Sequence, residues 1–335
     1  MAGPGRLRAV ITDDRFGSVD EERAVLEPLG VELVVAACVT SSDVARACAG
    51  ADAVLANLAP IDASAVVSMK RCRVVSRYGV GLDSVDVAAC AARGIIVANV
   101  PGYCDGEVAE HALGLLLSLT RGIPERDGAV RSGSWNLATP QYSIRGSTIG
   151  IAGFGGSGKA FARAVLGLGP ARVLLWSPNI DQARIHEALG PAAESLGVPA
   201  IAVPFDELLA ESDAISLHLR LAPTSAGIFG SQAFAAMKRG AFFVNTARGG
   251  LVDTVALAAA LRSGHLSGAG LDVLDTEPPP PDHPLLAAPN VILTDHCAYR
   301  STRSVTELKR RCAENAARAL GLLPSVASLV LPRAP

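Results

Sequence analysis

The sequence lacks the charge bias, long hydrophobic runs and signal segments that mark several large protein classes. Its 335 residues carry a net charge of −2 with no long run of either sign, which gives no support to binding of nucleic acids or membrane surfaces. The longest apolar segment, Ala112 to Leu119, is too short to span a bilayer, and the N-terminus lacks a signal-peptide core. We therefore expect a cytoplasmic protein that acts on small molecules, with no nucleic-acid or membrane partner.

Paired cysteines are also missing. The seven cysteines are odd in number, widely scattered and never spaced as C-x-x-C. This spacing predicts neither a disulfide framework nor a zinc site, so we expect no metal, and it suits a reducing compartment.

What the sequence does contain is a regular alternation of short apolar runs and amphipathic segments. This alternation predicts βαβ units and parallel sheets, and a chain that is 50% hydrophobic is long enough for two domains. Strands are expected at RAVIT, VELVVAA, AVLAN, RVVS, GIIVAN, RVLLW, IAVP, AISLHL, AFFVNTA, GAGLDV and NVILT. Residues 301–323 read as a long amphipathic helix that returns the chain to the first domain.

A glycine motif stands at the centre of the chain, between an apolar run and a helical segment. Gly153, Gly155 and Gly158 are spaced G-x-G-x-x-G, which predicts a strand, a tight turn and a helix whose first amides face a dinucleotide pyrophosphate. Two alternatives stay open. One is a degenerate P-loop, in which Ala160 replaces the hydroxyl residue, and the other is a turn with no ligand.

Two further sites depend on local sequence. Gly79, Val80 and Gly81 form a second glycine-rich turn, which either holds an anion such as a carboxylate or is a turn without a ligand. After RVLLW, Ser177 stands where a dinucleotide fold places an acid for the ribose, and Arg184 is the nearest cation. NAD and NADP therefore both remain open as cofactors.

Residues 100–123 predict a helix that is apolar on two sides and buried on both. Such a helix lies between domains, between subunits, or both. His111, within it, is interpreted as a packed or surface residue rather than a ligand.

Five stretches in this order resemble the D-isomer-specific 2-hydroxyacid dehydrogenase family: RYGVGLDSVD, VPGYCDGEVAEHALGLLL, GIAGFGGSGK, NTARGGLVD with GLDVLDTEP, and ILTDHCAYRS. The resemblance implies two doubly wound parallel-sheet α/β domains. A Rossmann nucleotide domain, residues 104–296, is inserted into a flavodoxin-like substrate domain, residues 1–103 and 297–335. It also implies a homodimer.

The resemblance implies a hydride transfer between nicotinamide and a small 2-hydroxy or 2-oxo acid. Arg248 would grip the substrate carboxylate, His296 would act as acid or base, and Glu277 would orient the histidine. Asp272 would hold the nicotinamide carboxamide. The remaining site residues that it implies are Gly156, Ser157, Thr246 and Ala247 for the cofactor and Tyr78, with Gly79, Val80 and Gly81, for the substrate.

Some residues depart from the family pattern. Gly156 and Ser157 replace a common Arg-Ile pair, and Asp295 replaces the proline before His296. The substrate is less defined. Cations such as Arg77 and Arg300 suit a second anionic group, a phosphate or phosphonate, although Arg300 also suits a helix cap.

A rival function comes from another class. The motifs GEVAEHA and TDHCAYRS also resemble corepressors of the C-terminal-binding-protein type, which share the fold and the catalytic trio but bind peptides. The alternative function is therefore a cofactor-sensing binding protein. Because the sequence ends soon after the long helix, we expect no appended regulatory domain.

Overall fold

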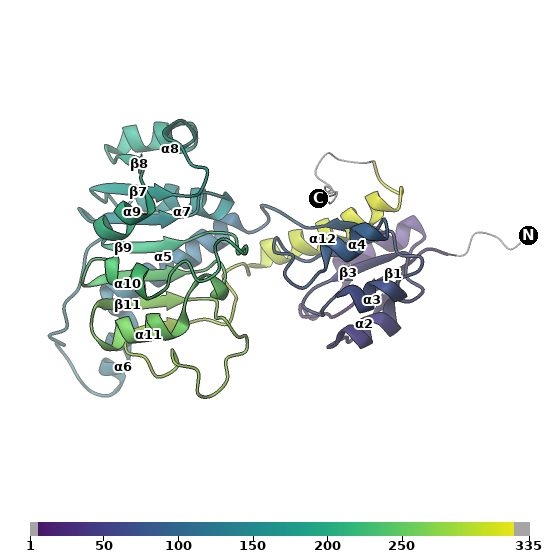
Figure 1. Ribbon diagram of the computed structural model, residues 1–335, viewed down its shortest axis with the longest axis horizontal. Coiled ribbons are helices and arrows are strands. Elements are labelled where there is room, and N and C mark those ends of the chain that lie inside the picture. The colour runs from purple at the N-terminus through teal and green to yellow at the C-terminus, as the bar shows by residue number, and fades with distance from the viewer. Residues whose placement is uncertain (1–5, 325–335) are drawn as a thin grey trace, which may run out of the picture. The chain divides into compact units, whose positions relative to one another are not determined.

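The computed structural model describes residues 6–324, and these form two compact units. Residues 6–103 and 301–324 form the first unit, and Cys104–Arg300 form the second (Figure 1). The second boundary lies after Arg300 rather than after His296, because the amides of Cys297 and Ala298 each donate to the Asp272 carboxylate at 2.9 Å. The outer ends of the predicted substrate domain, residues 1–5 and 325–335, lie outside the described residues.

The first unit is built on a five-stranded sheet with the order β2-β1-β3-β4-β5, and every strand pair is parallel. This is the flavodoxin-like order expected from the sequence. The elements are β1 (Arg8–Ile11), α1 (Asp20–Leu26), η1 (Glu27–Leu29), β2 (Glu32–Val35), α2 (Ser41–Cys48), β3 (Ala53–Ala56), α3 (Ala63–Ser68), β4 (Val74–Arg77), α4 (Val87–Ala92), β5 (Ile96–Ala98) and α12 (Thr302–Ala319).

Helix α12 belongs to this first unit, although it lies far along the chain. It begins with a capping box on Ser301, and its apolar face is buried against the sheet. The hydroxyl of Ser76, on β4, donates to the Cys312 carbonyl at 2.8 Å. The amphipathic pattern thus predicted a helix that does pack on the first sheet.

The second unit is built on a seven-stranded sheet, also wholly parallel, with the order β12-β11-β10-β9-β6-β7-β8. Counted from β6, this is the Rossmann order with one added strand. The elements are α5 (Asp105–Arg121), α6 (Ile123–Arg131), β6 (Thr148–Ala152), α7 (Gly156–Leu166), β7 (Arg172–Trp176), α8 (Gln182–Leu196), β8 (Ala200–Ala202), α9 (Phe205–Glu211), β9 (Ala214–Leu217), α10 (Ser231–Ala236), β10 (Ala241–Asn245), η2 (Gly249–Leu251), α11 (Thr254–Arg262), β11 (Leu266–Leu271) and β12 (Val291–Leu293).

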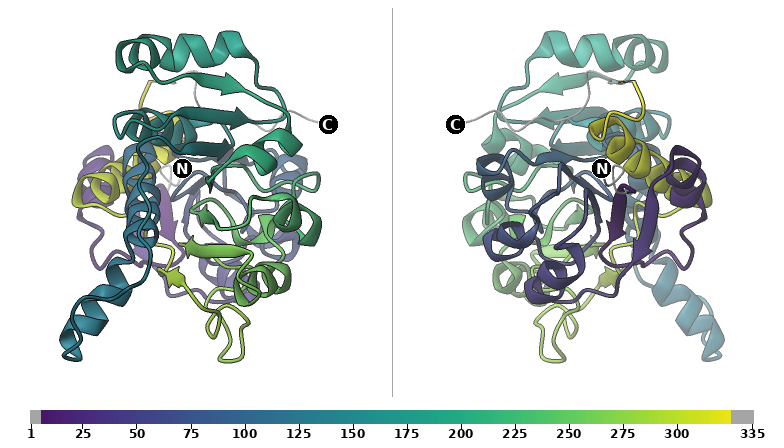
Figure 2. Two further views of the ribbon diagram at one scale, coloured as in Figure 1. Left: turned by 90° about the vertical axis from the view of Figure 1, so that its left-hand side faces the viewer. Right: turned by 90° about the vertical axis from the view of Figure 1, so that its right-hand side faces the viewer.

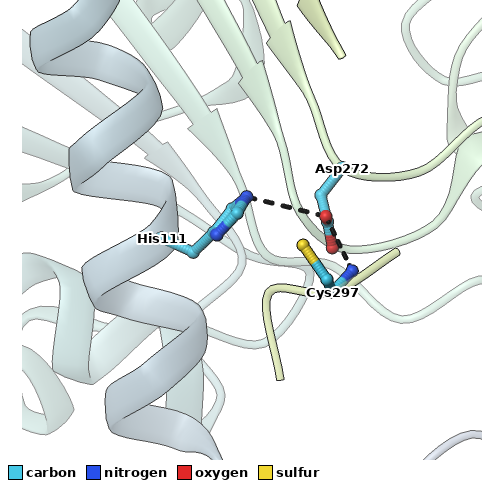
Figure 3. A group of neighbouring side chains, drawn as sticks. All are labelled: His111, Asp272 and Cys297. Atoms are coloured by element: carbon cyan, nitrogen blue, oxygen red, sulfur yellow. Dashed lines mark hydrogen bonds and ion pairs between the residues drawn. The ribbon is translucent and has the colours of Figure 1, made fainter. Parts of the chain in front are cut away.

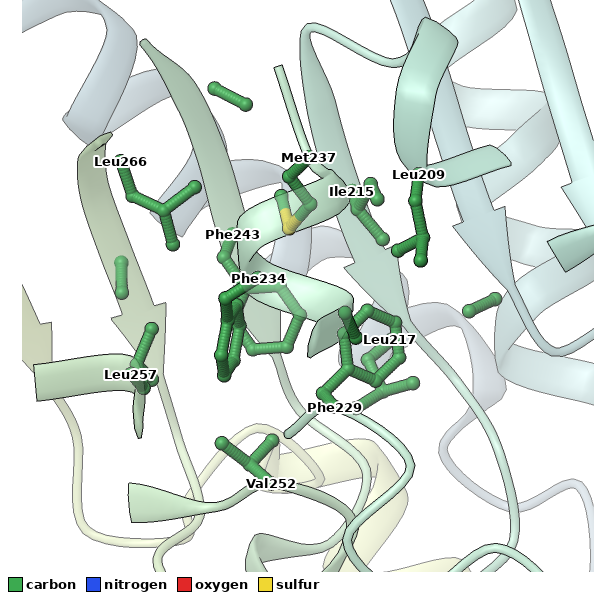
Figure 4. Packing of buried hydrophobic residues seen from close by; sticks show 14 of the residues in the cluster. Leu209, Ile215, Leu217, Phe229, Phe234, Met237, Phe243, Val252, Leu257 and Leu266 are labelled. Carbon is green, nitrogen blue, oxygen red and sulfur yellow. The ribbon is translucent and has the colours of Figure 1, made fainter. Parts of the chain in front are cut away.

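Helices cover both faces of this sheet, so alternate residues of its strands enter two different cores. Phe243 on β10 packs among Phe229 and Phe234 under α10 and α11 (Figure 4), whereas Phe242 and Val244 face α5 and α7. Burial of each phenylalanine contributes roughly 1.5–3 kcal/mol. The predicted fold class, two doubly wound α/β units with parallel sheets, is confirmed.

Helix α6 differs from the other helices of the second unit. None of its side chains is buried, and it extends beyond the sheet that α5 covers (Figure 2). No helix among the described residues is long and apolar enough to cross a membrane.

Candidate active site

The glycine motif joins β6 to α7 with the geometry expected from its spacing. Gly153 has φ +108, and a Cβ there would collide with the carbonyl of His218. A Cβ on Gly158 would collide with the carbonyl of Gly153, so this glycine lets α7 pack closely on the turn. A Cβ on Gly155 would meet open space. The motif therefore leaves room for a ligand at Gly155 and at no other glycine of the G-x-G-x-x-G spacing.

His218 lies under this turn at the end of β9. Its ring packs 5.1 Å from that of Phe161, and Ser216 Oγ lies 2.9 Å from its Nε2. Burial lowers the pKa of His218 to about 3, so the ring is neutral beside the motif.

An acid stands at the first turn of α7. A Cβ on Gly156 would collide with the carboxylate of Asp105, which opens α5. Burial, followed by the nearby charge of Glu107, raises the pKa of Asp105. In this structure the Asp105 carboxylate thus occupies the space that a side chain at position 156 would enter.

The NTARGG loop follows β10 at the same edge of the sheet. Asn245 fixes it: its amide nitrogen donates to the Arg248 carbonyl at 2.9 Å, and its side-chain oxygen accepts from the Ala247 amide at 2.9 Å. Gly249 brings the loop against the chain after β11, since a Cβ there would collide with the Leu274 carbonyl. The loop therefore holds Arg248 beside the segment that carries Glu277.

Glu277 and His296 are in direct contact. His296 Nδ1 lies 2.7 Å from Glu277 Oε2, and Glu277 Oε1 accepts from the Leu274 amide at 2.9 Å. Burial raises the pKa of Glu277, but the hydrogen bond and charge of His296, the Leu274 amide and the charge of Arg248 together lower it below its usual value. The three residues predicted as catalytic thus lie close enough to share one electrostatic environment.

The backbone of His296 is held in an uncommon conformation. Its φ is +54, in the left-handed region, and its amide donates to the Asp272 carbonyl at 2.9 Å. Because Nδ1 faces Glu277, Nε2 is the ring nitrogen left to reach a substrate.

Asp272 is the most heavily bonded acid of the site, and it is 2% exposed. Beyond the two amides of residues 297 and 298, it accepts from the Thr294 hydroxyl at 2.6 Å. His111 Nε2 lies 2.9 Å from Thr294 Oγ1 and 3.6 Å from Asp272 Oδ1, and the Cys297 sulfur lies near both side chains (Figure 3). Burial and the carboxylates of Asp295 and Asp272 raise the pKa of Cys297 to about 11.

The ribose position predicted from the sequence follows β7. The Ser177 carbonyl accepts from the Ile180 amide at 3.1 Å, and serine stands at this position where an acid was expected. Arg184 folds back so that its guanidinium donates to the Asn179 carbonyl at 2.6 Å. A cation therefore reaches the loop that carries Ser177.

In the first unit, the predicted substrate turn is tightly built. Gly79 has φ +129, and a Cβ there would collide with the Arg77 guanidinium. The Asn99 side chain donates to the Val80 carbonyl at 2.7 Å. Tyr78 is only 3% exposed, and its hydroxyl donates to Glu22 at 2.8 Å, so any substrate contact of Tyr78 comes from its backbone.

Sequence reasoning missed three residues that position the site. Asn245 is the first residue of the NTARGG motif, so its place beside Arg248 in the sequence could have revealed its role. Thr294 and His111 also lay within quoted stretches, ILTDHCAYRS and GEVAEHA, but the contact between them joins segments 183 residues apart, which no local spacing predicts.

Comparison with known proteins agrees with this arrangement. A family model described as "D-isomer specific 2-hydroxyacid dehydrogenase, NAD binding domain" matches residues 113–298. The fold, the glycine motif and the family model together place the chain in a class of two-domain oxidoreductases that bind NAD. The chain belongs to the D-isomer specific 2-hydroxyacid dehydrogenase family.

Individual relatives give the extent of the similarity. The chain is 42% identical to a D-3-phosphoglycerate dehydrogenase of Mycobacterium leprae over 73% of its own length and 45% of the relative, so it spans about half of that protein. It is 33% identical to a glycerate dehydrogenase of Methylorubrum extorquens over 82% of this chain and 85% of that one. The crystal structure of a glyoxylate reductase from Paecilomyes thermophila matches with a TM-score of 0.84 at 27% identity, covering 98% of each chain.

The residues of the second unit fit a dinucleotide. Gly155 faces open space at the start of α7, and the Thr246 hydroxyl is buried without a hydrogen-bond partner among the described residues. An orphaned buried hydroxyl costs stability unless a ligand supplies its partner. Open space and an unused hydroxyl both occur where the cofactor was expected.

Proposed function

We propose that this protein is an NAD(P)-dependent dehydrogenase or reductase that transfers a hydride between nicotinamide and a small 2-hydroxy or 2-oxo acid. The observation that carries the proposal is the 2.7 Å contact between His296 and Glu277, with Arg248 close enough to lower the pKa of the same carboxyl. An acid, a base and a fixed cation at the end of a parallel sheet suit carbonyl reduction.

The proposed roles follow from the chemistry of each side chain. Arg248 offers a planar guanidinium that can grip a substrate carboxylate with two hydrogen bonds. His296 donates the proton from Nε2 to the carbonyl oxygen during reduction and accepts it during oxidation. Glu277 keeps the ring oriented and stabilises the imidazolium. The bound nicotinamide supplies or accepts the hydride.

The cofactor would lie along the second unit. Gly155, with the amides of Gly156 and Ser157, would face the pyrophosphate at the start of α7, and Gly153 and Gly158 would shape the turn beneath it. Thr246, Ala247 and Asp272 would face the nicotinamide half, where the Thr246 hydroxyl gains a partner.

At the other end of the cofactor, Ser177 would face the ribose. Without a carboxylate there, a 2′-phosphate is not repelled, and Arg184 stands at the same loop. We therefore propose that NADPH is accepted as well as NADH, and that Arg184→Gln weakens binding of NADPH alone.

The substrate turn of the first unit would bind an anion through backbone amides of Gly79, Val80 and Gly81. The Arg77 guanidinium, which lies directly over Gly79, adds positive charge there. This favours a substrate with a second anionic group, such as a phosphate or phosphonate.

A homodimer is proposed through the second unit. Helix α6 buries none of its side chains, and Ile123, Val130 and Trp135 are 52%, 51% and 77% exposed. Exposed apolar residues on a projecting helix and just beyond its end favour a protein partner, here a second copy. Light scattering of the purified protein measures the mass, and Val130→Lys should shift a dimer toward monomer.

The test of the proposed function is turnover of a panel of 2-oxo acids, phosphonates included, with NADH and with NADPH. We expect reduction of at least one acid, with loss of activity in Arg248→Gln. Tight cofactor binding with no turnover of any acid would instead favour the cofactor-sensing, corepressor-like alternative.

A further inference from the structure

Three side chains of the second unit form a group with the donor set of a metal site. They are His111 from α5, Asp272 after β11, and Cys297 beside His296 (Figure 3). One nitrogen, one oxygen and one sulfur atom all lie within 4.8 Å of one another. The sequence predicted no metal because these residues share no local spacing.

The geometry points to a Zn²⁺ site, and we propose that His111 Nε2, Asp272 Oδ1 and Cys297 Sγ bind Zn²⁺ in competition with the cofactor. Mixed nitrogen, oxygen and sulfur donors suit Zn²⁺ and exclude Mg²⁺ and Ca²⁺, which prefer oxygen alone. Ligands about 2.0–2.3 Å from a tetrahedral zinc stand roughly 3.5 Å apart, so the side chains need to close by only about 1 Å.

The surroundings already orient these ligands. Asp272 is held by the Ala298 amide at Oδ2 and by the Cys297 amide at Oδ1, which is the kind of outer shell that fixes a metal-binding carboxylate. The Thr294 hydroxyl, which donates to Oδ1 and contacts His111 Nε2, gives up both contacts to the zinc. On binding, the thiol proton of Cys297 passes to solvent. The proton that His111 Nε2 donates to Thr294 Oγ1 in the structure leaves Nε2 through solvent, and Nδ1 carries the ring proton in the zinc-bound form. The fourth position of the zinc is left to water.

Cys297 is also the accessible thiol of the chain. All seven cysteines lie within the described residues, and the other six are buried. A thiol-dependent effect of Zn²⁺ can therefore be assigned to Cys297.

The competition with the cofactor rests on the proposed function, because it needs Asp272 to hold the nicotinamide carboxamide. Zn²⁺ on Asp272 Oδ1 removes that acceptor. When free Zn²⁺ stands tenfold above its own Kd, the apparent Kd for NADH should rise about tenfold.

Calorimetric titration of the whole chain with Zn²⁺, in the absence of cofactor, tests the site itself. We expect one Zn²⁺ per chain. Loss of an outer-shell partner alone lowers metal affinity about 10–100-fold, so Cys297→Ser and His111→Gln, which each remove a ligand, should weaken Zn²⁺ binding by at least about 100-fold. His186→Gln is the matched control, since this histidine is exposed and its ion pair with Glu194, at 3.8 Å, lies apart from the proposed ligands. Co²⁺ should give thiolate-to-metal absorption that Cys297→Ser abolishes. Unchanged Zn²⁺ affinity in both site variants would overturn the proposal.

A second titration separates the site from the function. NADH is titrated with and without Zn²⁺ into the wild type and Cys297→Ser, and only the wild type should lose NADH affinity. If Zn²⁺ binds through the trio while NADH affinity stays unchanged, the competition is wrong. If NADH does not bind even without Zn²⁺, the proposed function fails, and the calorimetry alone decides the metal site.

Discussion

Gly249→Ala should separate Arg248 from its partners while leaving the fold intact. A Cβ at this position would collide with the Leu274 carbonyl, which is backbone and cannot rotate away. Ordinary van der Waals contact begins at 3.4 Å, so one loop must move by about 1 Å or more. Such overpacking costs about 1–3 kcal/mol, and a 1 Å displacement of a substrate-gripping group costs about 100-fold in rate.

Gly250→Ala is the matched control. Its Cβ would meet only the Leu221 side chain, at 3.1 Å, and that side chain can rotate. We expect kcat/KM for 2-oxo acid reduction to fall about 100-fold in Gly249→Ala and less than about threefold in Gly250→Ala. Thermal melting of both variants measures the loss of stability. Wild-type kcat/KM in Gly249→Ala would refute the role of this close contact.

Three further changes test other parts of the site. Thr246→Val should weaken NADH binding by about 1 kcal/mol without lowering the Tm of the cofactor-free protein, because the hydroxyl has no partner there; a lower Tm would contradict this. Asp105→Asn should tighten NADH binding two- to fivefold, about 0.5–1 kcal/mol, by removing a negative charge from the first turn of α7; weaker binding in a fluorescence titration would be the opposite result. Because the pKa of Glu277 is lower in the folded protein than in the unfolded chain, its ionised carboxylate stabilises the fold. This stabilisation is fully present above pH 4.5 and is lost as the pH falls through the pKa of the folded protein. Glu277 is 37% exposed, so Glu277→Gln should lower the free energy of unfolding by less than about 1 kcal/mol near neutral pH. Denaturant melts in acid should give nearly equal free energies of unfolding for the variant and the wild type; a difference that does not narrow with falling pH would contradict this prediction.

The sequence predicted those features that depend on short spacing or on regular periodicity. All eleven β-rich runs predicted as strands form strands in the structure. The three glycines of the motif have the expected surroundings: Gly153 lies in the tight turn, Gly155 faces open space, and Gly158 packs against the turn. The contact between Glu277 and His296 was expected from family motifs, since nothing in their own spacing brings residues 19 apart together.

Other features depend on packing that no short stretch encodes. The link from His111 to Asp272 arises where α5 lies against β10 and β11, far away in sequence. Helix α6 was not predicted because it buries no side chain and so carries no apolar period. Tyr78 was expected at the substrate turn, but the sequence did not predict that its hydroxyl donates to Glu22, 56 residues away.

The proton-transfer role of His296 is tested most directly by rapid mixing of the NADH-bound protein with an excess of a reducible 2-oxo acid, for the wild type and for His296→Gln. Glutamine keeps a polar side chain but cannot exchange a proton near neutral pH. We predict that both proteins bind NADH with equal affinity and that only the wild type oxidises it within a single turnover. Equal single-turnover rates would contradict the assignment of His296 as the acid.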